Sequence, residues 1–405
     1  MPRKQLIYSK LDNRDSIRIH HFNKGAKEDN LMSKFSRLNL QTSDDAREMA
    51  KRRLPKMAFD YFDGSALTEY GEFLGRQAIK EIRLAPKVLA KGSDRQINHQ
   101  ILNMKTDIPF GIAPMGMCNL SHPRADKIIA KVGSAFNTPV CFSTMASTAL
   151  EDTIKLTDGN GWFQLYVYDD PQAGLDMADR AADAGYKTLI LTVDVPDLGR
   201  RPRELRQNFK VPWWPTISQF IDCATRPSWS ISMLMAGGSP IPANFKGMPP
   251  FRRDRPRAAA DWEFLKKLRD KWKGKLIVKG VLDPKDAKKI KDIGVDAVYV
   301  SGHGARQLDS LPAPITQLPK IRQAVGKSYP LIFDTGVRNG EDIVKAYASG
   351  ANFVMLGRPI LYALAADGER GLKTIIHYIS KEIQVTLAQI GLGKISEVNG
   401  NNLIT

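Results

Sequence analysis

The sequence predicts an α/β fold, a (β/α)8 TIM barrel, from two observations. Eight short apolar runs of the kind that form buried strands follow one another after residue 107, and segments with helical periodicity lie between most of them. Parallel strands require such crossover helices, so the alternation is typical of an eight-stranded barrel. A doubly wound open sheet is the alternative, but it would need a G-x-G-x-x-G turn after its first strand, and the sequence contains none.

The expected strands form two groups of four. The first group reads "IPFGIAP" (108–114), "PVCFSTM" (139–145), "GWFQLYV" (161–167) and "TLILTVD" (188–194). The second group reads "KLIVKG" (275–280), "DAVYVSG" (296–302), "PLIFDTG" (330–336) and "NFVMLGR" (352–358). Segments such as "DPKDAKKIKDIG" and "NGEDIVKAYASG" combine an amphipathic pattern with a final glycine, which predicts helices that end there.

Two further segments lie outside this alternation. Residues 1–40 are polar and basic without a sustained period, and we expect an N-terminal extension there, ahead of a barrel domain at 41–405. One or two helices are expected between Thr42 and Gly64, because Thr42 and Asp45 have the spacing of a capping box. Residues from about 200 to 258 break the strand rhythm and predict an insertion after strand four.

Composition indicates a folded soluble protein, with 42% hydrophobic and 25% charged residues. Cys118, Cys141 and Cys223 lack disulfide or zinc-ligand spacing, so no metal site is expected and a reducing compartment is favoured. The sequence shows no apolar run long enough for a membrane span and no signal-peptide core, which predicts a cytoplasmic protein or one bound peripherally to the membrane's inner face. The net charge of +17 predicts an anionic partner without identifying it.

Polar residues follow the expected strands at the end where such barrels carry their chemistry. Burial of Asp194, Lys279 and His303 would be unfavourable unless they share a polar pocket, so we expect these three to converge. The strand-end residues are Ser143, Gln164, Tyr166, Thr192, Asp194, Lys279, Ser301, His303, Asp334, Gly357 and Arg358.

The motif "GHGAR" places His303 between two glycines, with Arg306 three residues later. Gly302 and Gly304 are expected to let a flat ligand approach the backbone and to leave the imidazole pointing into the pocket. Arg306 offers a planar fork for a carboxylate. The motif alone is equally compatible with an ordinary loop histidine and a surface arginine.

Two later motifs favour a cofactor that carries phosphate. "DTGVRNG" (334–340) and "LGRP" (356–359) place glycines and Arg338 or Arg358 after strands seven and eight, where barrels commonly bind phosphate. Two ordinary glycine turns with solvated arginines are the alternative. Lys279, at the end of strand five, is suited to stabilise negative charge on a reduced ring, which favours flavin over nicotinamide.

These motifs resemble the FMN-dependent α-hydroxy acid dehydrogenase/oxidase family, and bacterial flavin-linked L-lactate dehydrogenases in particular. The resemblance extends from about Ser43 to the C-terminus. The matching motifs, in order, are "LPKMAFDYFDGSA", "FGIAP", "FSTMA", "WFQLYVY", "LTVDVPDLGRR", "IVKG", "GHGARQLD", "DTGVRNGEDIVKA" and "LGRP".

The resemblance implies a role for each matching residue. His303 would be the base that takes the α-proton or the hydroxyl proton, with Asp194 paired to its imidazole. The other expected substrate contacts are Tyr166 on the hydroxyl, Arg306 and Tyr61 on the carboxylate, and Arg201 from the loop after strand four. The expected FMN contacts are Pro114, Met115, Gly116, Ser143, Gln164, Thr192, Lys279, Ser301, Asp334, Gly336, Arg338, Gly357 and Arg358.

The chain departs from the family pattern at a few positions. Gly302 stands where the family usually has asparagine, which removes a hydrogen-bonding side chain from the histidine loop. Met115 replaces a small polar residue and predicts a more apolar wall. Gly116 resembles the dehydrogenase members, whereas many oxidases carry alanine there.

The expected insertion is basic and contains Trp213, Trp214 and Trp229. Cations beside tryptophans suit an anionic membrane interface, and membrane-attached family members use this insertion. A solvated loop whose tryptophans pack on the barrel is the alternative. Nucleic acid is not favoured, because no recognisable binding module is present.

The resemblance therefore implies FMN-dependent oxidation of a short L-2-hydroxy acid, with L-lactate favoured, and transfer of the electrons to quinone or another acceptor. A soluble oxidase that produces hydrogen peroxide is one alternative. A flavin barrel with an altered function other than hydroxy acid oxidation is another, motivated by Gly302 and Met115. The resemblance also implies a homo-oligomer, a tetramer.

Overall fold

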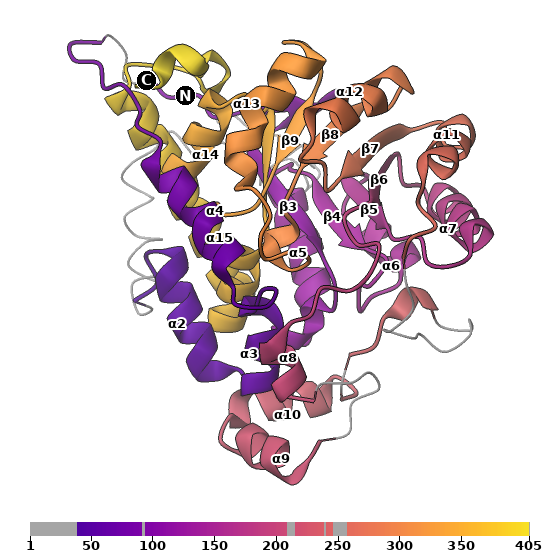
Figure 1. The fold of residues 1–405 in the computed structure, drawn as a ribbon. Helices are drawn as coiled ribbons and strands as arrows, with labels where there is room; N and C mark the ends of the chain where they lie inside the picture. The colour runs from indigo at the N-terminus through magenta and orange to yellow at the C-terminus, as the bar shows by residue number, and fades with distance from the viewer. Residues whose placement is uncertain (1–38, 91–93, 209–214, 239, 246–256, 405) are drawn as a thin grey trace, which may run out of the picture. The chain divides into compact units, whose positions relative to one another are not determined.

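Eight parallel strands close into a barrel in the computed structural model (Figure 1), which describes residues 39–404 except 91–93, 209–214, 239 and 246–256. The predicted fold class is therefore confirmed. The strands are β3 (Phe110–Met115), β4 (Val140–Ser143), β5 (Gly161–Leu165), β6 (Thr188–Thr192), β7 (Lys275–Lys279), β8 (Ala297–Val300), β9 (Leu331–Phe333) and β10 (Phe353–Leu356). All eight lie within the expected apolar runs or begin and end within two residues of them. Strand β10 closes the barrel by pairing with β3, where Val354 lies opposite Phe110.

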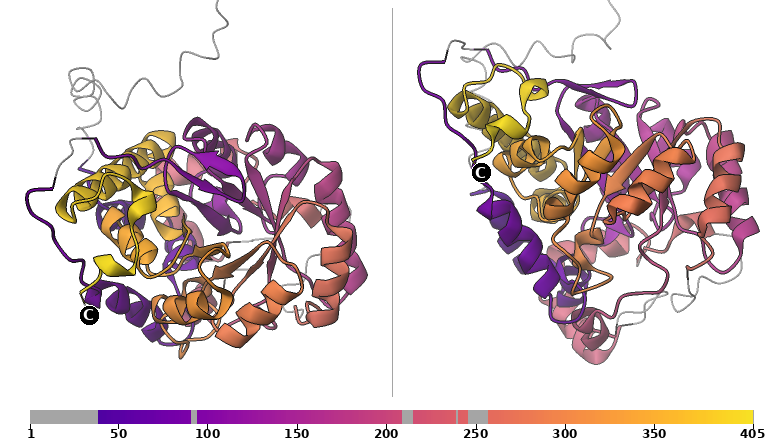
Figure 2. Two further views of the ribbon diagram at one scale, coloured as in Figure 1. Left: turned by 90° about the horizontal axis from the view of Figure 1, so that it is seen from above. Right: turned by 45° about the horizontal axis from the view of Figure 1, so that its top comes forward.

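Helices surround the strands on the outside of the barrel (Figure 2). They are α5 (Ala125–Ala135), α6 (Leu150–Lys155), α7 (Pro171–Asp183), α11 (Trp262–Lys271), α12 (Pro284–Asp292), α13 (Pro314–Val325), α14 (Gly340–Ala348) and α15 (Arg358–Gln389). Several begin where a side chain caps the first turn: Asp170, Asp261, Asp283 and Asn339 each accept a backbone N–H. Helix α15 is interrupted at Asp367 and Gly368.

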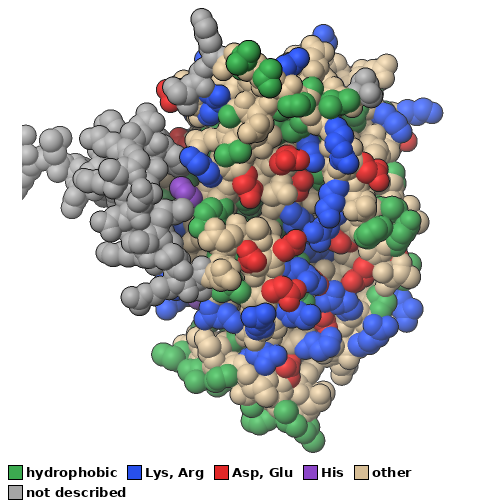
Figure 3. Space-filling view, turned by 90° about the vertical axis from the view of Figure 1, so that its left-hand side faces the viewer, with side chains coloured by type: hydrophobic (Ala, Val, Ile, Leu, Met, Phe, Trp, Pro, Cys, Tyr) green, Lys and Arg blue, Asp and Glu red, His purple; other side chains and the backbone are tan. Residues whose placement is uncertain are grey.

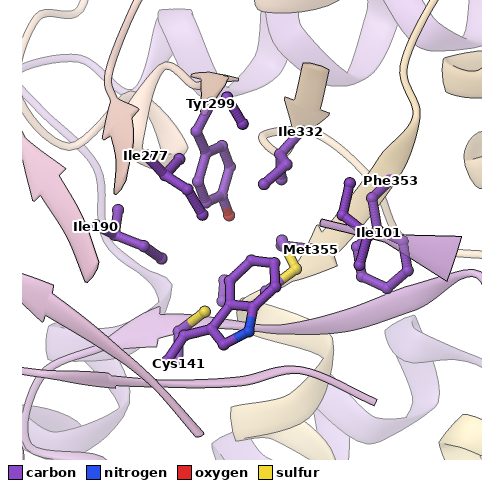
Figure 4. Close-up of a cluster of buried hydrophobic side chains, with 11 residues drawn as sticks. Ile101, Cys141, Ile190, Ile277, Tyr299, Ile332, Phe353 and Met355 are labelled. Atoms are coloured by element: carbon purple, nitrogen blue, oxygen red, sulfur yellow. The ribbon is translucent and has the colours of Figure 1, made fainter. Parts of the chain in front are cut away.

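The interior of the barrel is filled by apolar side chains (Figure 4). Trp162, Tyr299 and Phe353 supply the largest rings, and each is at most 3% exposed. Ile101 joins this cluster from a hairpin of β1 (His99–Ile101) and β2 (Met104–Thr106), which the sequence did not predict. Because the core fills the barrel, a ligand can reach only the ends of the strands.

In the part of the chain that the structure describes, three helices precede the barrel: α2 (Ser43–Arg53), α3 (Lys56–Asp63) and α4 (Tyr70–Glu81). The capping box at Thr42 and Asp45 is present, and α3 ends at the expected Gly64. Helix α2 packs against α15, and α4 packs against α13 and α14. Residues Leu40–Thr405 form one compact unit. The predicted extension at 1–40 lies outside the described residues, apart from its last two.

The described residues of the expected insertion include three short α-helices: α8 (Pro202–Arg206), α9 (Ile217–Ala224) and α10 (Pro227–Met235). Trp229 of α10 is buried and donates its indole N–H to the Leu120 carbonyl at 2.8 Å. It therefore packs inward, whereas Trp213 and Trp214 lie outside the described residues. Figure 3 shows hydrophobic side chains at the lower end of the molecule, where α9 and α10 lie in Figure 1, with Lys and Arg gathered just above them.

Candidate active site

His303 lies on a short turn that directly follows β8. The turn is unusual because His303, Gly304 and Ala305 all have positive φ angles, of 53°, 62° and 57°. The backbone N–H of His303 donates to the Ser301 hydroxyl at 3.0 Å. This hydrogen bond helps to hold a backbone conformation that residues other than glycine rarely adopt. Such conformations are concentrated at functional sites.

Thr335, which the sequence did not single out, stabilises the same turn. Its hydroxyl oxygen accepts the N–H groups of Gly302 at 3.1 Å and Gly304 at 3.2 Å, and the hydroxyl donates to Asp334 at 2.8 Å. Thr335 itself has a φ of 78°, a strained value for a β-branched residue. The Thr335 hydroxyl, just after β9, thus accepts hydrogen bonds from the His303 turn, in which Gly302 stands in place of an asparagine.

Gly302 and Gly304, on either side of His303, lie against other side chains of the protein. A Cβ atom on Gly302 would lie 2.9 Å from Pro314 and would clash with Leu311, and one on Gly304 would lie 2.7 Å from an Arg358 nitrogen. Protein side chains therefore occupy the space where a Cβ atom would lie, while His303 and Gly304 line the cavity. Gly302 replaces asparagine at a position where a longer side chain would not fit.

A chain of hydrogen bonds connects Asp194, His303 and Tyr166. Asp194 Oδ1 lies 2.9 Å from His303 Nδ1, and the Tyr166 hydroxyl lies 3.2 Å from Nε2. Burial lowers the pKa of His303; the Asp194 charge opposes this shift and Lys279 reinforces it. The imidazole is then neutral at neutral pH, donates Nδ1–H to Asp194, and can accept a proton at Nε2.

The two neighbours of His303 keep complementary protonation states. Burial alone would raise the pKa of Asp194, but electrostatic interaction with the His303 ring and with the Lys279 ammonium, together with the imidazole hydrogen bond, brings it below its ordinary value. Burial raises the pKa of Tyr166, so its hydroxyl stays protonated. The site therefore presents a carboxylate, a neutral base and a hydroxyl donor in line.

Lys279 is buried beside this chain, at the end of β7. Its Nζ donates to the Ser301 hydroxyl at 2.9 Å and lies 3.9 Å from Asp334 Oδ2. The strand register pairs Lys279 with Thr192 on one side and Tyr299 on the other. The ammonium group therefore lies at the carboxyl end of the barrel, as its place in the sequence predicted.

Polar atoms without partners mark the wall formed by β4, β5 and β6. Ser143 donates to Gln164 Oε1 at 2.6 Å, across a register pair of β4 and β5. Within the described part of the chain, Gln164 Nε2 and Thr192 Oγ1 are buried without a hydrogen-bond partner. Such groups are unfavourable unless a ligand satisfies them. A flat ring with donors and acceptors along its edge, as in flavin, fits this wall.

The two arginines expected at a phosphate are already engaged by the protein. Arg338 donates to Glu72 Oε1 at 2.8 Å and to its neighbouring carbonyl at Val337. Arg358 donates to the carbonyls of Phe62, Gly64 and Gly304 and to the Ser65 hydroxyl. Both line the cavity, so each can still contribute positive charge to a phosphate there.

Arg306 and Arg201 share a buried carboxylate, that of Glu204. Arg306 Nη2 lies 2.8 Å and Arg201 Nη1 3.1 Å from the same oxygen of Glu204, which is 3% exposed. Arg306 also donates to the carbonyls of Tyr61 at 2.8 Å and Gly64 at 2.7 Å. The sequence did not predict Glu204, whose acidic charge stands among the basic residues of the insertion.

Arg257 is a cation at the cavity that the sequence did not predict. It is 7% exposed and lines the same cavity as His303 and Lys279. Its guanidinium carbon lies 5.5 Å from the Tyr166 ring centre and 5.0 Å from that of Tyr168. In the sequence it was one of many basic residues of the insertion, and no spacing distinguished it from the others.

The structure brings most of the predicted residues to one cavity at the carboxyl ends of the strands. Those that line it are Tyr61, Pro114, Met115, Gly116, Ser143, Tyr166, Arg201, Lys279, His303, Arg306, Asp334, Gly336, Arg338, Gly357 and Arg358. The other four lie directly behind this lining. Asp194 contacts His303, Ser301 contacts Lys279, Gln164 contacts Ser143, and Thr192 pairs with Lys279 in the barrel.

Several known proteins are similar to this chain in sequence and in fold over most of their length. The family model described as FMN-dependent dehydrogenase matches residues 50–405. The (S)-mandelate dehydrogenase of Pseudomonas putida is 36% identical over 373 residues, which cover 90% of this chain and 94% of that protein. The L-lactate dehydrogenase of Caulobacter vibrioides is 34% identical and covers 89% and 96%.

A plant oxidase and a solved structure extend the comparison. A peroxisomal (S)-2-hydroxyacid oxidase of Arabidopsis thaliana is 35% identical, covering 89% of this chain and 96% of that one. A crystal structure described as monotopic membrane protein (S)-mandelate dehydrogenase superposes with a TM-score of 0.85 at 35% identity, covering 90% of this chain and 99% of that chain. With the site geometry, these matches show that the chain belongs to the FMN-dependent α-hydroxy acid dehydrogenase family and is an enzyme that oxidises a 2-hydroxy acid with FMN.

Proposed function

We propose that the enzyme oxidises a short L-2-hydroxy acid to the 2-oxo acid, with His303 as the base. The observation that carries this proposal is the chain of Asp194, His303 and Tyr166 beside Lys279, because it holds a neutral imidazole between a carboxylate and a hydroxyl donor. L-lactate is the simplest substrate of this class and the first to test. Among the relatives, the names refer to mandelate, lactate and 2-hydroxyacids.

In the proposed reaction the protein moves the protons and holds the substrate. His303 Nε2 takes the α-proton or the hydroxyl proton, and Asp194 stabilises the imidazolium that forms. Tyr166 hydrogen-bonds the substrate hydroxyl. Arg306, Arg201 and Tyr61 hold the carboxylate; the two arginines and Glu204 together keep one net positive charge for it. FMN, when bound, accepts the two electrons that the substrate loses.

The residues that would hold FMN are those that line the cavity and three that lie directly behind the lining. Ser143, Gln164 and Thr192 would satisfy the polar ring atoms, and Pro114, Met115 and Gly116 would lie along the ring. Lys279, with Ser301 and Asp334 beside it, would balance the negative charge of the reduced ring. Gly336, Arg338, Gly357 and Arg358 would hold the phosphate.

The test is anaerobic mixing of the purified yellow protein with L-lactate and other 2-hydroxy acids, followed by flavin absorbance. Replacement of the base, His303→Gln, should keep bound flavin and slow its bleaching by about 10²–10⁴-fold. His377→Gln, on the outer helix α15, is the matched control and should bleach at the wild-type rate. A His303 variant that bleaches normally would show that another group is the base.

We further propose that α9 and α10 rest on a membrane and that quinone accepts the electrons. The apolar side chains exposed there are Ile217, Phe220, Ile221, Ile231, Leu234 and Met235, between 57% and 85% exposed. Lys51, Arg52 and Arg53 at the end of α2 are exposed as well, and Lys56 N–H donates to Asp222 of α9 at 2.6 Å, so these cations lie near the patch. Apolar side chains bordered by cations suit an anionic membrane surface.

This second proposal is supported by a relative whose crystal structure is described as a monotopic membrane protein. No helix among the described residues is long and apolar enough to cross a membrane. Sedimentation with anionic vesicles should carry the wild-type protein down, whereas the double variant Phe220→Asp/Leu234→Asp should stay in the supernatant. Val385→Asp, on another exposed apolar side chain, is the control. Equal sedimentation of all three would refute membrane contact through α9 and α10.

The acceptor and the oligomer are tested on the same preparation. Turnover with a soluble quinone should exceed turnover with oxygen, whereas rapid peroxide release would favour the oxidase alternative.

The predicted tetramer should appear as a species of four chains in light scattering after detergent extraction. Failure of every 2-hydroxy acid to bleach the flavin would favour a barrel with a different activity.

A further inference from the structure

Arg257 is a buried cation that the described residues do not balance. Its Nε and Nη1 have no hydrogen-bond partner among those residues, although the side chain is 7% exposed. A buried charge without a partner is strongly unfavourable, so the usual expectation is a compensating anion. Because Arg257 lines the cavity that holds His303, that anion can belong to the substrate.

The position of Arg257 is fixed from two sides. Its backbone N–H donates to the Pro196 carbonyl at 2.9 Å, which ties the end of the insertion to the loop after β6. Its guanidinium lies over the rings of Tyr166 and Tyr168, and it hydrogen-bonds the Tyr168 hydroxyl. Contact with two rings holds the guanidinium at the cavity, where its Nε and Nη1 have no partner among the described residues.

The distance from the reacting centre suits the far end of a substrate. Arg257 contacts the ring of Tyr166, whereas His303 contacts its hydroxyl group. The substrate's side chain, rather than its reacting carbon, would therefore reach Arg257.

Arg257 differs from the pair Arg306 and Arg201 in how its charge is balanced. Arg306 and Arg201 share Glu204 and keep one net positive charge, which matches the one carboxylate that every 2-hydroxy acid carries. Arg257 adds a further positive charge, and no carboxylate among the described residues is paired with it. A substrate with two negative charges would balance both.

We propose that the preferred substrate is a 2-hydroxy acid whose side chain ends in a second carboxylate, and that Arg257 binds this group. The inference rests on the proposed function and narrows its substrate class. A neutral side chain would leave Nε and Nη1 of Arg257 without a partner among the described residues, and sites of this kind discriminate strongly against such analogues. A carboxylate can accept two parallel hydrogen bonds from the fork.

The test compares two substrates of equal chain length, (S)-2-hydroxybutanedioate and (S)-2-hydroxybutanoate, by kcat/KM with an artificial electron acceptor. The diacid should be favoured by about 10- to 100-fold, the range expected for a charge-assisted hydrogen bond. Arg257→Met should reduce this ratio to near one, and Arg257→Lys should retain part of it. Arg206→Met, on an exposed cation of α8, is the control and should keep the wild-type ratio.

Binding of unreactive analogues gives a second readout. Butanedioate should perturb the flavin spectrum at lower concentration than butanoate in the wild type, and this difference should vanish in Arg257→Met. A wild type without preference for the diacid, or an Arg257→Met variant with an unchanged ratio, would overturn the inference. Oxidation of 2-hydroxybutanoate in that case would leave the proposed function intact, whereas a flavin that no 2-hydroxy acid bleaches would refute the proposed function itself.

Discussion

Replacement of Thr335 by valine tests whether its hydroxyl positions His303. Valine keeps the shape of threonine but removes three hydrogen bonds, two from the N–H groups of Gly302 and Gly304 and one to Asp334. Gly302 is buried, so its unsatisfied N–H costs about 1–3 kcal/mol, and the other two losses add about 1–2 kcal/mol together. We expect the free energy of unfolding to fall by about 2–5 kcal/mol.

The same substitution should slow catalysis. If displacement of His303 from its catalytic position raises the activation free energy by about 1.4 kcal/mol, flavin reduction slows about tenfold. Stopped-flow absorbance under anaerobic conditions measures that rate, and chemical denaturation measures the stability. The kcat should change more than KM, since the substrate carboxylate is held elsewhere.

Two companion variants separate the hydroxyl from the strain. Thr335→Ser keeps the hydroxyl and should reduce the flavin at nearly the wild-type rate. Thr335→Gly also lacks the hydroxyl but removes the strain of a β-branched residue at a φ of 78°, about 1–3 kcal/mol, so it should be more stable than Thr335→Val. A valine variant with wild-type stability and reduction rate would refute the positioning role.

Three more predictions concern the charged groups of the site. Because burial lowers the pKa of His303 and the base must be neutral, kcat/KM should stay constant at neutral pH and fall only as pH drops below about 6.5; a fall that begins near pH 8 would contradict this. Lys279→Ala should lose flavin on gel filtration and reduce the remainder slowly, as absorbance would show. Glu204→Gln leaves the buried Arg201 and the half-buried Arg306 without their carboxylate and should lower the free energy of unfolding by about 3–5 kcal/mol in urea denaturation.

The strands of the barrel were predictable because each is a continuous apolar run between polar segments. Strands β1 and β2 were not, since three residues are too few to carry a periodic pattern. Asp194, Lys279 and His303 were predictable from their places at strand ends, where the topology brings them together. Their convergence follows from the barrel alone.

Other parts of the site depend on information that strand order does not contain. Glu204, which binds two arginines of the cavity, and Arg257, which lines it, both come from the insertion. The path of the insertion depends on tertiary contacts such as the hydrogen bond between Arg257 and Pro196. The strain at Thr335 is a backbone property that its residue type would argue against. Gly302 suggested an open loop, whereas contacts with Leu311 and Pro314 occupy that space.

Arginine clamps from the barrel loops hold the segment that precedes the barrel. Arg306 and Arg358 together bind the main-chain carbonyls of Tyr61, Phe62 and Gly64. Helix α3 is thus part of the catalytic wall, although more than forty residues separate it from the first barrel strand. The smallest fragment able to work must start upstream of α3, and grafting this chemistry onto another barrel would require transplanting that helix together with both arginines.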